Sequence, residues 1–388
     1  MQTRRGFLSS SSAVASVSMI AIGNSHAQKK YKAAIIGRTG GGDYGHGYDI
    51  IFNGLDNISV VAVADPDEAG RQKAAQRSSA SNQYADYKTM LQTEKPDLVS
   101  IGPRHPDCHK DMALAAIENG AHIFMEKPIT ETLEESDAII RAAEAKGTKI
   151  AIAHNRRYTR VFRQIQALIE RGVIGAVLEM RVYGKQDSRS GGEDLIVLGT
   201  HDFDMMRLYF GDPLWCSATV WKDGRDITTA DAHMGKEPLL VAGDTITATF
   251  AFPNNLFCHW TSVKTNDHWN TRFSDRENWR FDVNGTKAII AHQSVAGAAI
   301  WNSPFPAHTD GSVQWTDLPE PSGWRLPEHE LHPIKNLIHA VENDVQPICS
   351  MYDGRWAIEM VSAVYQSHFK QGRVHFPLEK RSHPLRTN

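Results

Sequence analysis

The first half of the chain alternates short apolar runs, rich in Val and Ile, with segments of helical spacing. Strands that alternate with helices of 10–15 residues pair in parallel through right-handed crossovers. We therefore expect a parallel α/β sheet in this half. The strands are predicted at 33–36, 59–64, 97–101, 122–125 and 149–153, with helices at 67–77, at 109–118 and from a capping box at Thr132 and Glu135 to Gly147.

The pattern changes after about Tyr158, where longer runs of alternating polarity follow one helix at 161–171. Such runs are typical of a mostly antiparallel sheet with one face covered. The predicted strands are 176–183, 245–252, 256–263 and 279–283, followed by a surface loop at 304–327, helices at 333–342 and 354–369, and a closing apolar run at 373–378.

The N-terminal segment departs from both patterns. Residues 1–27 contain no acid and only two bases, Arg4 and Arg5, which precede an apolar run and end in small residues. That order is typical of an export signal, and the adjacent arginines followed by Gly6-Phe7-Leu8 resemble the twin-arginine signal, which exports folded proteins. An ordinary secretion signal is the alternative. The run is too short and serine-rich for a membrane span, so we expect a periplasmic or extracellular protein without a stable membrane anchor.

Composition narrows the class of protein. The 388 residues are 41% hydrophobic and 22% charged, which excludes disordered, collagenous and coiled-coil chains and suggests two or three domains. Lys and Arg number 42 against 45 acids, so no basic excess indicates nucleic-acid binding. The four cysteines are widely spaced, which argues against a zinc ribbon or disulfide scaffold. We expect no metal, because acids beside a helical histidine such as His201 more often cap or contact substrate.

Glycines cluster directly after the first predicted strand, between Gly37 and Gly47. In a parallel α/β sheet this turn binds a dinucleotide pyrophosphate, because glycine lets the backbone approach and a helix N-terminus favours the anion. The match to G-x-G-x-x-G is imperfect, since Thr39 occupies the second glycine position counted from Gly37. The cofactor contacts predicted here are Gly37, Arg38, Thr39, Gly40 and Gly42.

Asp65 ends the second predicted strand. An acid at this position binds the adenosine ribose hydroxyls, which favours NAD over NADP. Arg38 and Arg71 could instead meet a 2′-phosphate, and Asp65 with Asp67 could simply cap the next helix. The sequence therefore predicts NAD as the cofactor, with NADP as the less favoured choice.

The fourth predicted strand ends in Glu126-Lys127-Pro128. The carboxyl ends of parallel strands face the ligand crevice. A lysine there can polarise or protonate a substrate oxygen, and its pKa falls readily on burial. The alternative is a surface lysine in a turn.

These motifs occur in order with Asn155-Arg156-Arg157-Tyr158, and with Gly191-Gly192 followed by His201-x-x-Asp204. Together they resemble the Gfo/Idh/MocA family of glucose–fructose oxidoreductases and inositol dehydrogenases. The resemblance implies an NAD(P)-binding Rossmann domain at 28–155, after the export signal at 1–27. It also implies an α+β domain at 156–388, whose open, mostly antiparallel sheet mediates homo-oligomers, and oxidation or reduction of sugars, glycosides or cyclic polyols.

The resemblance also assigns residues. Lys127 and His201 match the catalytic lysine and histidine, and Glu126 and Arg156 match positions that run beside the cofactor. The expected contacts to a polyhydroxylated substrate are Lys127, Arg157, Tyr158, Lys185, Glu193, Asp194, His201 and Asp204.

One position departs from the family pattern. Dehydrogenases of the family commonly have an Asp four residues before this histidine, where this chain has Val197. Glu193 or Asp194 could substitute for it, or His201 and Lys127 could act without a carboxylate. The pair Thr200-His201 is also similar to NAD-dependent glycosidases, although those enzymes lack the lysine retained here.

Export sets a further condition, because free nicotinamide cofactor is not available outside the cytoplasm. The expectation is a tightly bound cofactor that is recycled within turnover. The alternatives are an NAD-dependent glycosidase or lyase that oxidises a sugar transiently, and a non-catalytic secreted sugar-binding protein.

Overall fold

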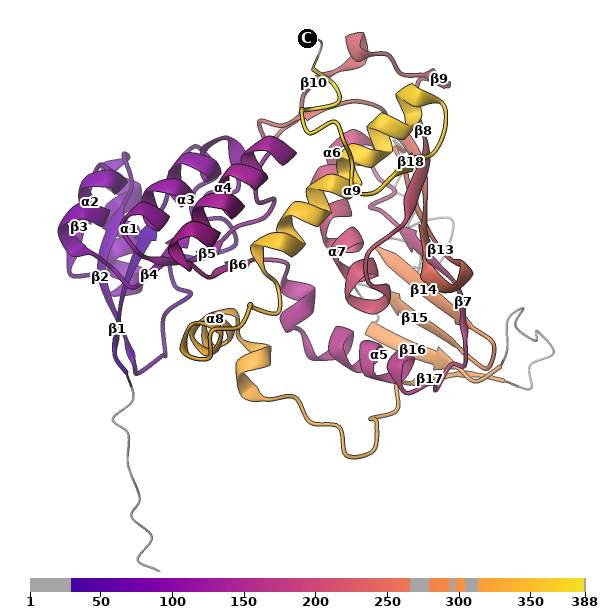
Figure 1. Cartoon of the computed structure of the whole chain (residues 1–388), viewed down its shortest axis with the longest axis horizontal. Coiled ribbons are helices and arrows are strands. Elements are labelled where there is room, and N and C mark those ends of the chain that lie inside the picture. Colours follow the sequence, from indigo (N-terminus) through magenta and orange to yellow (C-terminus); the bar gives the residue numbers. More distant parts are fainter. Residues whose placement is uncertain (1–28, 266–278, 294–296, 304–312, 387–388) are drawn as a thin grey trace, which may run out of the picture.

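The structure, a computed structural model, describes residues 29–265, 279–293, 297–303 and 313–386. The chain forms two lobes, one built from the N-terminal third and the other from most of the remainder (Figure 1). The predicted export signal at 1–27 lies outside the described residues. Within the described ranges, no helix is long and apolar enough to cross a membrane.

The first lobe contains a parallel sheet, which among the described residues has six strands in the order β3-β2-β1-β4-β5-β6. The order reverses between β1 and β4, so the ligand crevice of such a sheet opens at the carboxyl ends of these strands. The strands are β1 (Tyr31–Ile36), β2 (Ile58–Ala64), β3 (Asn82–Tyr84), β4 (Leu98–Ile101), β5 (His122–Met125) and β6 (Ile150–Ile152).

The helices of this lobe begin at capping residues that the sequence contains. Asp67, Asp86 and Thr132 each accept a hydrogen bond from a backbone N–H in the first turn that follows. The pattern had not indicated β3 or the short helix after it. The helices are α1 (Glu68–Ser78), α2 (Tyr87–Glu94), α3 (His109–Glu118) and α4 (Leu133–Lys146).

The segment between β1 and β2 corrects one expectation. The glycine-rich turn was expected to open a helix, but residues 37–57 form successive turns, with an isolated bridge between Arg38 and Asp43. Positive φ angles at Gly40, Gly42 and Gly45 bend this segment in ways that a regular helix excludes.

The second lobe is built on a mixed sheet, with ten strands in the described ranges. All pairings in it are antiparallel except that between β7 and β13. This confirms the expected α/β fold with an open, mostly antiparallel second sheet. Its strands are β7 (Val177–Tyr183), β8 (Trp215–Lys222), β9 (Arg225–Asp226), β12 (Thr245–Phe252), β13 (Leu256–Val263), β14 (Arg280–Gly285), β15 (Ile289–Gln293), β16 (Gly297–Trp301), β17 (Trp315–Asp317) and β18 (Val374–His375), and a separate pair is β10 (His233–Met234) with β11 (Leu240–Val241).

Helices join the two lobes. The long helix α9 contacts β8 of the second sheet, α7 and α4, and so lies between the lobes (Figure 1). The helix α8 packs Ile334, Leu337 and Ile338 into the core of the first lobe, although the sequence boundary at 155 places it in the second domain. The helices of this part are α5 (Arg160–Glu170), α6 (Gly192–Val197), α7 (Gly199–Phe210), α8 (Pro333–Glu342) and α9 (Met351–Lys370).

Candidate active site

Lys127 lies at the carboxyl end of β5 and is 5% exposed. Its ammonium Nζ donates a hydrogen bond of 3.1 Å to the backbone carbonyl of Val197, in the second lobe. Burial lowers the pKa of Lys127, and the nearby cations Lys185 and Arg104 act in the same direction, against Glu126 and Glu237. The lysine therefore spans the crevice between the lobes and loses its proton more readily than a surface lysine.

The carbonyl that Lys127 contacts is the last of α6, and two glycines position this helix. Gly191 has a φ of +85°, and a Cβ there would lie 2.4 Å from the Gly243 carbonyl oxygen. A Cβ at Gly192 would lie 2.4 Å from the Ala242 carbonyl oxygen. The Gly-Gly pair thus seats α6 against the 242–243 backbone. At position 197 Lys127 therefore donates its hydrogen bond to a main-chain oxygen, which every type of residue provides.

Asp194 is fully buried one turn earlier on α6. Its Oδ2 accepts hydrogen bonds from the Lys185 backbone N–H at 2.8 Å and from Ser262 Oγ at 2.7 Å. The Lys185 ammonium lies 3.5 Å from Asp194 Oδ1, and burial raises the pKa of Asp194 to about 6. Asp194 and Lys185 therefore form a buried ion pair whose cation also acts on Lys127.

Glu193, the other acid considered as a substitute, points elsewhere. It lines a polar cavity of about 580 Å³ in the second lobe, together with Ser190, Lys222 and Lys264. The structure thus separates the two adjacent acids, with Asp194 beside the Lys185 ammonium and Glu193 in this cavity.

His201 is partly buried in the first turn of α7. Burial lowers its pKa well below the usual value, and Lys127, His154, Arg156 and His46 all act in the same direction. Its imidazole ring is therefore neutral around pH 7, which is the form that accepts a proton.

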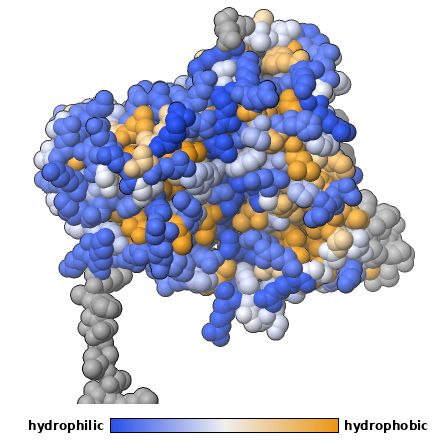
Figure 2. All heavy atoms as spheres, viewed as in Figure 1, coloured by the Kyte–Doolittle hydropathy of each residue, from blue (hydrophilic) through white to orange (hydrophobic). Residues whose placement is uncertain are grey.

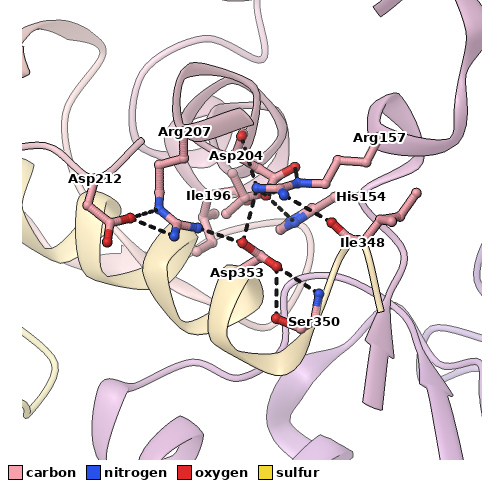
Figure 3. Close-up of polar contacts among 10 residues, drawn as sticks. His154, Arg157, Ile196, Asp204, Arg207, Asp212, Ile348, Ser350 and Asp353 are labelled. Carbon is pink, nitrogen blue, oxygen red and sulfur yellow. Dashed lines mark hydrogen bonds and ion pairs between the residues drawn. The ribbon is translucent and has the colours of Figure 1, made fainter. Parts of the chain in front are cut away.

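Arg157, Tyr158 and Asp204, expected as substrate contacts, are buried within the structure instead. Figure 3 shows Arg157 between Asp204 and Asp353. The Arg157 Nε donates to both oxygens of Asp204 at 2.9 Å, and a terminal nitrogen of its guanidinium lies 3.1 Å from Asp353. The guanidinium holds the pKa of Asp204 well below its usual range. These side chains join η2 (Asn155–Tyr158) to α7 and α9, so the structure assigns them a structural role in place of the expected substrate contact.

His154 and Cys349 lie beside Asp204, and one potential ligand atom from each of the three side chains falls within 4.8 Å of the others. The Arg157 guanidinium already occupies both Asp204 oxygens, however, and a cation placed there would meet its positive charge. We assign no metal to this group.

Arg156 was expected beside the cofactor. In the structure it donates a hydrogen bond of 2.5 Å to Asp202 Oδ1, while Trp260 Nε1 donates to the other oxygen at 2.9 Å. Arg156 also acts electrostatically on His201. It therefore lies at the same end of the crevice as the candidate catalytic residues.

Side chains at Arg38 and Thr39 tie the nucleotide loop, residues 37–47, to the neighbouring strand ends. Arg38 forms an ion pair of 2.8 Å with Asp107, across the crevice end of the sheet. Thr39 donates to Asp65 from its backbone N–H at 3.0 Å and from its hydroxyl at 2.8 Å. Asp65 is thereby buried against the loop. The N-cap of α1 is Asp67, which accepts from the Gly70 N–H at 2.6 Å.

The loop fits a dinucleotide at specific points. Gly40 has a φ of +77°, and no atom lies within 4 Å of the position its Cβ would take, so a phosphate can approach the backbone there. A Cβ at Gly37 would instead meet the Tyr44 ring at 2.1 Å, so that glycine serves internal packing. Gly42 lies against the Arg104 and His105 backbone. Gly40 and the cations Arg38, Arg104 and Lys127 at the same strand ends suit a phosphate-bearing cofactor.

His46 and His154 belong to this site although the sequence analysis did not single them out. His46 Nδ1 contacts Glu126 Oε1, next to Lys127, and both histidines act on His201. A sequence signal existed for His154, since it follows β6 at the same strand edge where Lys127 follows β5. The signal for His46 was its place within the glycine-rich loop.

Two family profiles match the chain. The profile described as oxidoreductase family, NAD-binding Rossmann fold, covers residues 31–154, and the one described as oxidoreductase family, C-terminal alpha/beta domain, covers residues 166–376. The first lobe therefore matches the NAD-binding Rossmann domain of an oxidoreductase family, and the second lobe matches the C-terminal domain of the same family. The chain belongs to the Gfo/Idh/MocA family.

Similar proteins include sugar and inositol dehydrogenases. Levoglucosan dehydrogenase of Pseudarthrobacter phenanthrenivorans is 29% identical over 203 residues, which are 46% of this chain and 51% of that protein. Myo-inositol 2-dehydrogenase of Thermotoga maritima is 24% identical over 50% of this chain and 57% of its own. The chain thus matches about half the length of these relatives.

The fold is shared more widely than the sequence. A levoglucosan dehydrogenase in complex with NADH and L-sorbose superposes with a TM-score of 0.70 at 19% identity, over 90% of this chain and 100% of that one. An Agrobacterium radiobacter oxidoreductase with NAD+, L-tartaric acid and magnesium gives 0.68 at 15% identity, over 89% and 98%. These likenesses support the fold.

Proposed function

We propose that the protein oxidises a secondary hydroxyl of a sugar, glycoside or cyclic polyol, with NAD as the hydride acceptor. The observation that carries this proposal is that Lys127, which follows β5 at the crevice end of an NAD-binding sheet, contacts the Val197 carbonyl and acts electrostatically on His201 of α7. The sugar and inositol dehydrogenases among the relatives support this class of substrate.

Lys127 and His201 have different roles in the proposed reaction. When bound, nicotinamide accepts the hydride that leaves the substrate carbon. Lys127, held by the Val197 carbonyl, donates a hydrogen bond to the reacting oxygen. The neutral His201 ring accepts the hydroxyl proton, so that C–O–H becomes C=O. Asp194 and Lys185 form a buried ion pair nearby, and the Lys185 ammonium acts electrostatically on Lys127.

NAD binding is assigned to the loop after β1 and to the strand ends beside it. Gly40 admits the pyrophosphate, with Arg38 and Arg104 near it. Asp65 binds the ribose once its bonds to Thr39 give way. NADP is the less favoured choice, because a buried acid at this strand end repels a 2′-phosphate.

Our proposal includes export by the twin-arginine pathway with the cofactor already bound, and placement in the periplasm or outside the cell. The cofactor then cycles within turnover, by oxidising one sugar and reducing another. The test is purification of the exported protein without added cofactor, followed by measurement of its absorbance and of released nucleotide. A preparation without stoichiometric NAD(P) would refute tight binding.

A second candidate is a glycosidase or lyase, favoured by the absence of a side-chain carboxylate at Val197. Oxidation of a sugar hydroxyl, with the hydride held by NAD, would acidify the neighbouring C–H, and loss of that proton would expel the aglycone, which takes up a proton. In a glycosidase, water would then add to the resulting double bond, and return of the hydride to the ketone would regenerate NAD; a lyase would omit the water addition.

Incubation with glycosides and polyols supplied one at a time distinguishes the candidates. A dehydrogenase with bound cofactor forms one equivalent of ketone and of reduced cofactor until a second sugar is added, whereas a glycosidase releases aglycone continuously without net reduction. Saccharide binding with neither change would indicate a non-catalytic binding protein.

The open face of the second sheet is the proposed homo-oligomer interface. The helix α9 covers one face of β8, and on the other face Thr219, Thr247 and Thr261 pair across β8, β12 and β13. Phe257 is exposed on that same face. Figure 2 shows apolar residues gathered at the surface of the second lobe, over this part of the sheet.

A further inference from the structure

His154 is a buried histidine whose surroundings are unusual. It lies two residues after the end of β6 and is 1% exposed, and neither of its ring nitrogens has a hydrogen-bond partner in the structure. A fully buried, unpartnered polar side chain is costly, so the surroundings of His154 need an explanation. Two neighbouring side chains, Asp204 and His201, provide this explanation.

The first neighbour is Asp204, whose Oδ1 lies 3.6 Å from His154 Nδ1 (Figure 3). Arg157 keeps this carboxylate ionised, so a fixed negative charge faces one edge of the imidazole. Cys349 and Asp353 complete the titratable groups around Asp204. The Asp204 carboxylate and the His154 ring are thus held against each other inside the structure.

The second neighbour is His201. The two rings meet edge to face, with centroids 5.4 Å apart and planes at 67°. The other titratable groups acting on His201 are Lys127, Arg156 and His46, from β5, η2 and the nucleotide loop. His154 and these three groups all lower the pKa of His201, so together they disfavour an imidazolium at that ring.

We infer that His154 is a positioning residue that sets the orientation of the His201 ring and keeps it neutral, with Asp204 as its anchor. This inference rests on the proposed function in one respect, that His201 is the proton acceptor. His154 packs edge to face against the His201 ring and so limits the orientations that this ring can take. His154 thus helps to keep His201 in the proton-accepting form, and this effect does not require a carboxylate at position 197.

The direct test is an NMR titration of the histidine C–H signals in the wild-type protein and in His154→Gln. Glutamine keeps a polar side chain of similar length but carries no charge. We expect the pKa of His201 to rise in this variant, because the electrostatic effect of His154 that lowers it is lost. The titration needs no substrate, so its result stands even if the proposed function fails. An unchanged His201 titration in folded His154→Gln would overturn the inference.

Kinetics give a second readout. The neutral form of His201 is the base, so kcat/KM falls as pH drops below its pKa. If that pKa rises in His154→Gln, the acid limb of the profile moves to higher pH, and kcat falls by about 10- to 100-fold while KM changes little. A uniform loss without a shift of the limb would indicate a merely structural role and contradict the inference.

Two further variants keep the test decisive. His154→Asn serves if the glutamine variant does not fold, as judged by thermal melting. His122→Gln is the matched control, because His122 lies at the other end of β5 and its Nδ1 accepts from the Lys149 N–H at 3.0 Å. The control should leave both the His201 titration and the kinetic profile unchanged.

Discussion

A buried lysine gives up its proton more readily because its ammonium has lost most of its water. At Lys127 the lost hydration is partly offset by one hydrogen bond to the Val197 carbonyl oxygen and by the negative charges of Glu126 and Glu237. The geometry leaves the amine facing the crevice that the substrate must enter. Its contribution should therefore appear in the chemical step and leave cofactor binding intact.

We expect Lys127→Met to reduce hydride transfer by at least about 100-fold while bound NAD is retained, because methionine keeps the volume but offers no proton or hydrogen bond. Single-turnover absorbance at the reduced-nicotinamide band measures the chemical step, and nucleotide released on denaturation measures binding. Lys149→Met, at the opposite end of the sheet, is the control. Undiminished turnover across the substrate panel would refute the assignment of Lys127.

Arg157, unlike Lys127, is expected to contribute to the stability of the fold and not to the chemical step. Arg157→Met leaves the Asp204 carboxylate buried without its partner, which should lower the free energy of unfolding by about 3–5 kcal/mol. Urea denaturation measures the loss. Arg160→Met removes an exposed ion pair with Glu320 and should cost less than about 1 kcal/mol. Equal losses in the two variants would contradict the structural role of Arg157.

The pH dependence of this loss has a definite sign. The pKa of Asp204 is depressed in the folded state, so its stabilisation is present above the pKa of an unfolded aspartate, about 3.9, and disappears as pH falls below it. The stability gap between wild type and Arg157→Met should therefore narrow under acid conditions. Unfolding curves at a series of pH values would show whether it does.

The residue scale also shows what sequence can and cannot predict about a site. Lys127 was predictable because the end of a parallel strand has a fixed place in the fold. Arg157 and Asp204 were expected to contact substrate, because the family motif contains them and the pattern does not reveal burial. His154 follows a strand just as Lys127 does, but its contact with His201 depends on the packing of two lobes.

At the scale of elements, α6 is a short helix whose start is fixed by close approach of two backbone segments. Gly191→Ala should therefore be costly on two counts, a positive φ and a Cβ 2.4 Å from the Gly243 carbonyl oxygen. Gly211 has nearly the same backbone angles, φ 79° and ψ −155° against φ 85° and ψ −140°, and open space around its Cβ position. Comparing the alanine variants at these two glycines separates the energetic cost of backbone strain from that of a steric clash.

We expect Gly211→Ala to lose about 1–2 kcal/mol from backbone strain alone. Gly191→Ala should lose about 1–3 kcal/mol more, because the clash adds to the strain. It should also reduce activity, since α6 carries the Val197 carbonyl that holds Lys127. Thermal unfolding and kcat of both variants measure these effects. Similar values for the two would show that the close approach at Gly191 does not matter.

Most elements were predictable where periodicity and caps agreed, as for β2, α4 and β12. The pattern failed after β1, where glycines suggested a loop leading into a helix. The structure bends there at Gly40, Gly42 and Gly45, which periodicity does not encode. The short pieces α6 and β3 were missed because they are held by contacts with distant backbone, such as that of residues 242–243, and their own sequences carry little signal.

On the scale of the whole molecule, the second sheet has one face covered by helices and one open. If the open face joins copies of the chain, Phe257→Arg should shift the protein toward smaller species, because it places a charge among apolar and threonine side chains. Sedimentation velocity measures the change. Val173→Arg, after α5, alters a side chain of similar exposure and should have no effect. A wild-type protein that sediments as a monomer would refute this interface.

The hydrogen bond from Lys127 to a main-chain oxygen affects which residue types position 197 can tolerate as the sequence changes. A carboxylate partner would confine position 197 to one or two residue types. A carbonyl partner leaves the side chain of residue 197 unconstrained by the lysine, so that substitutions there can reshape the entrance without disconnecting Lys127. Inherited and engineered changes of substrate preference are thus open to this chain at a position beside its chemistry.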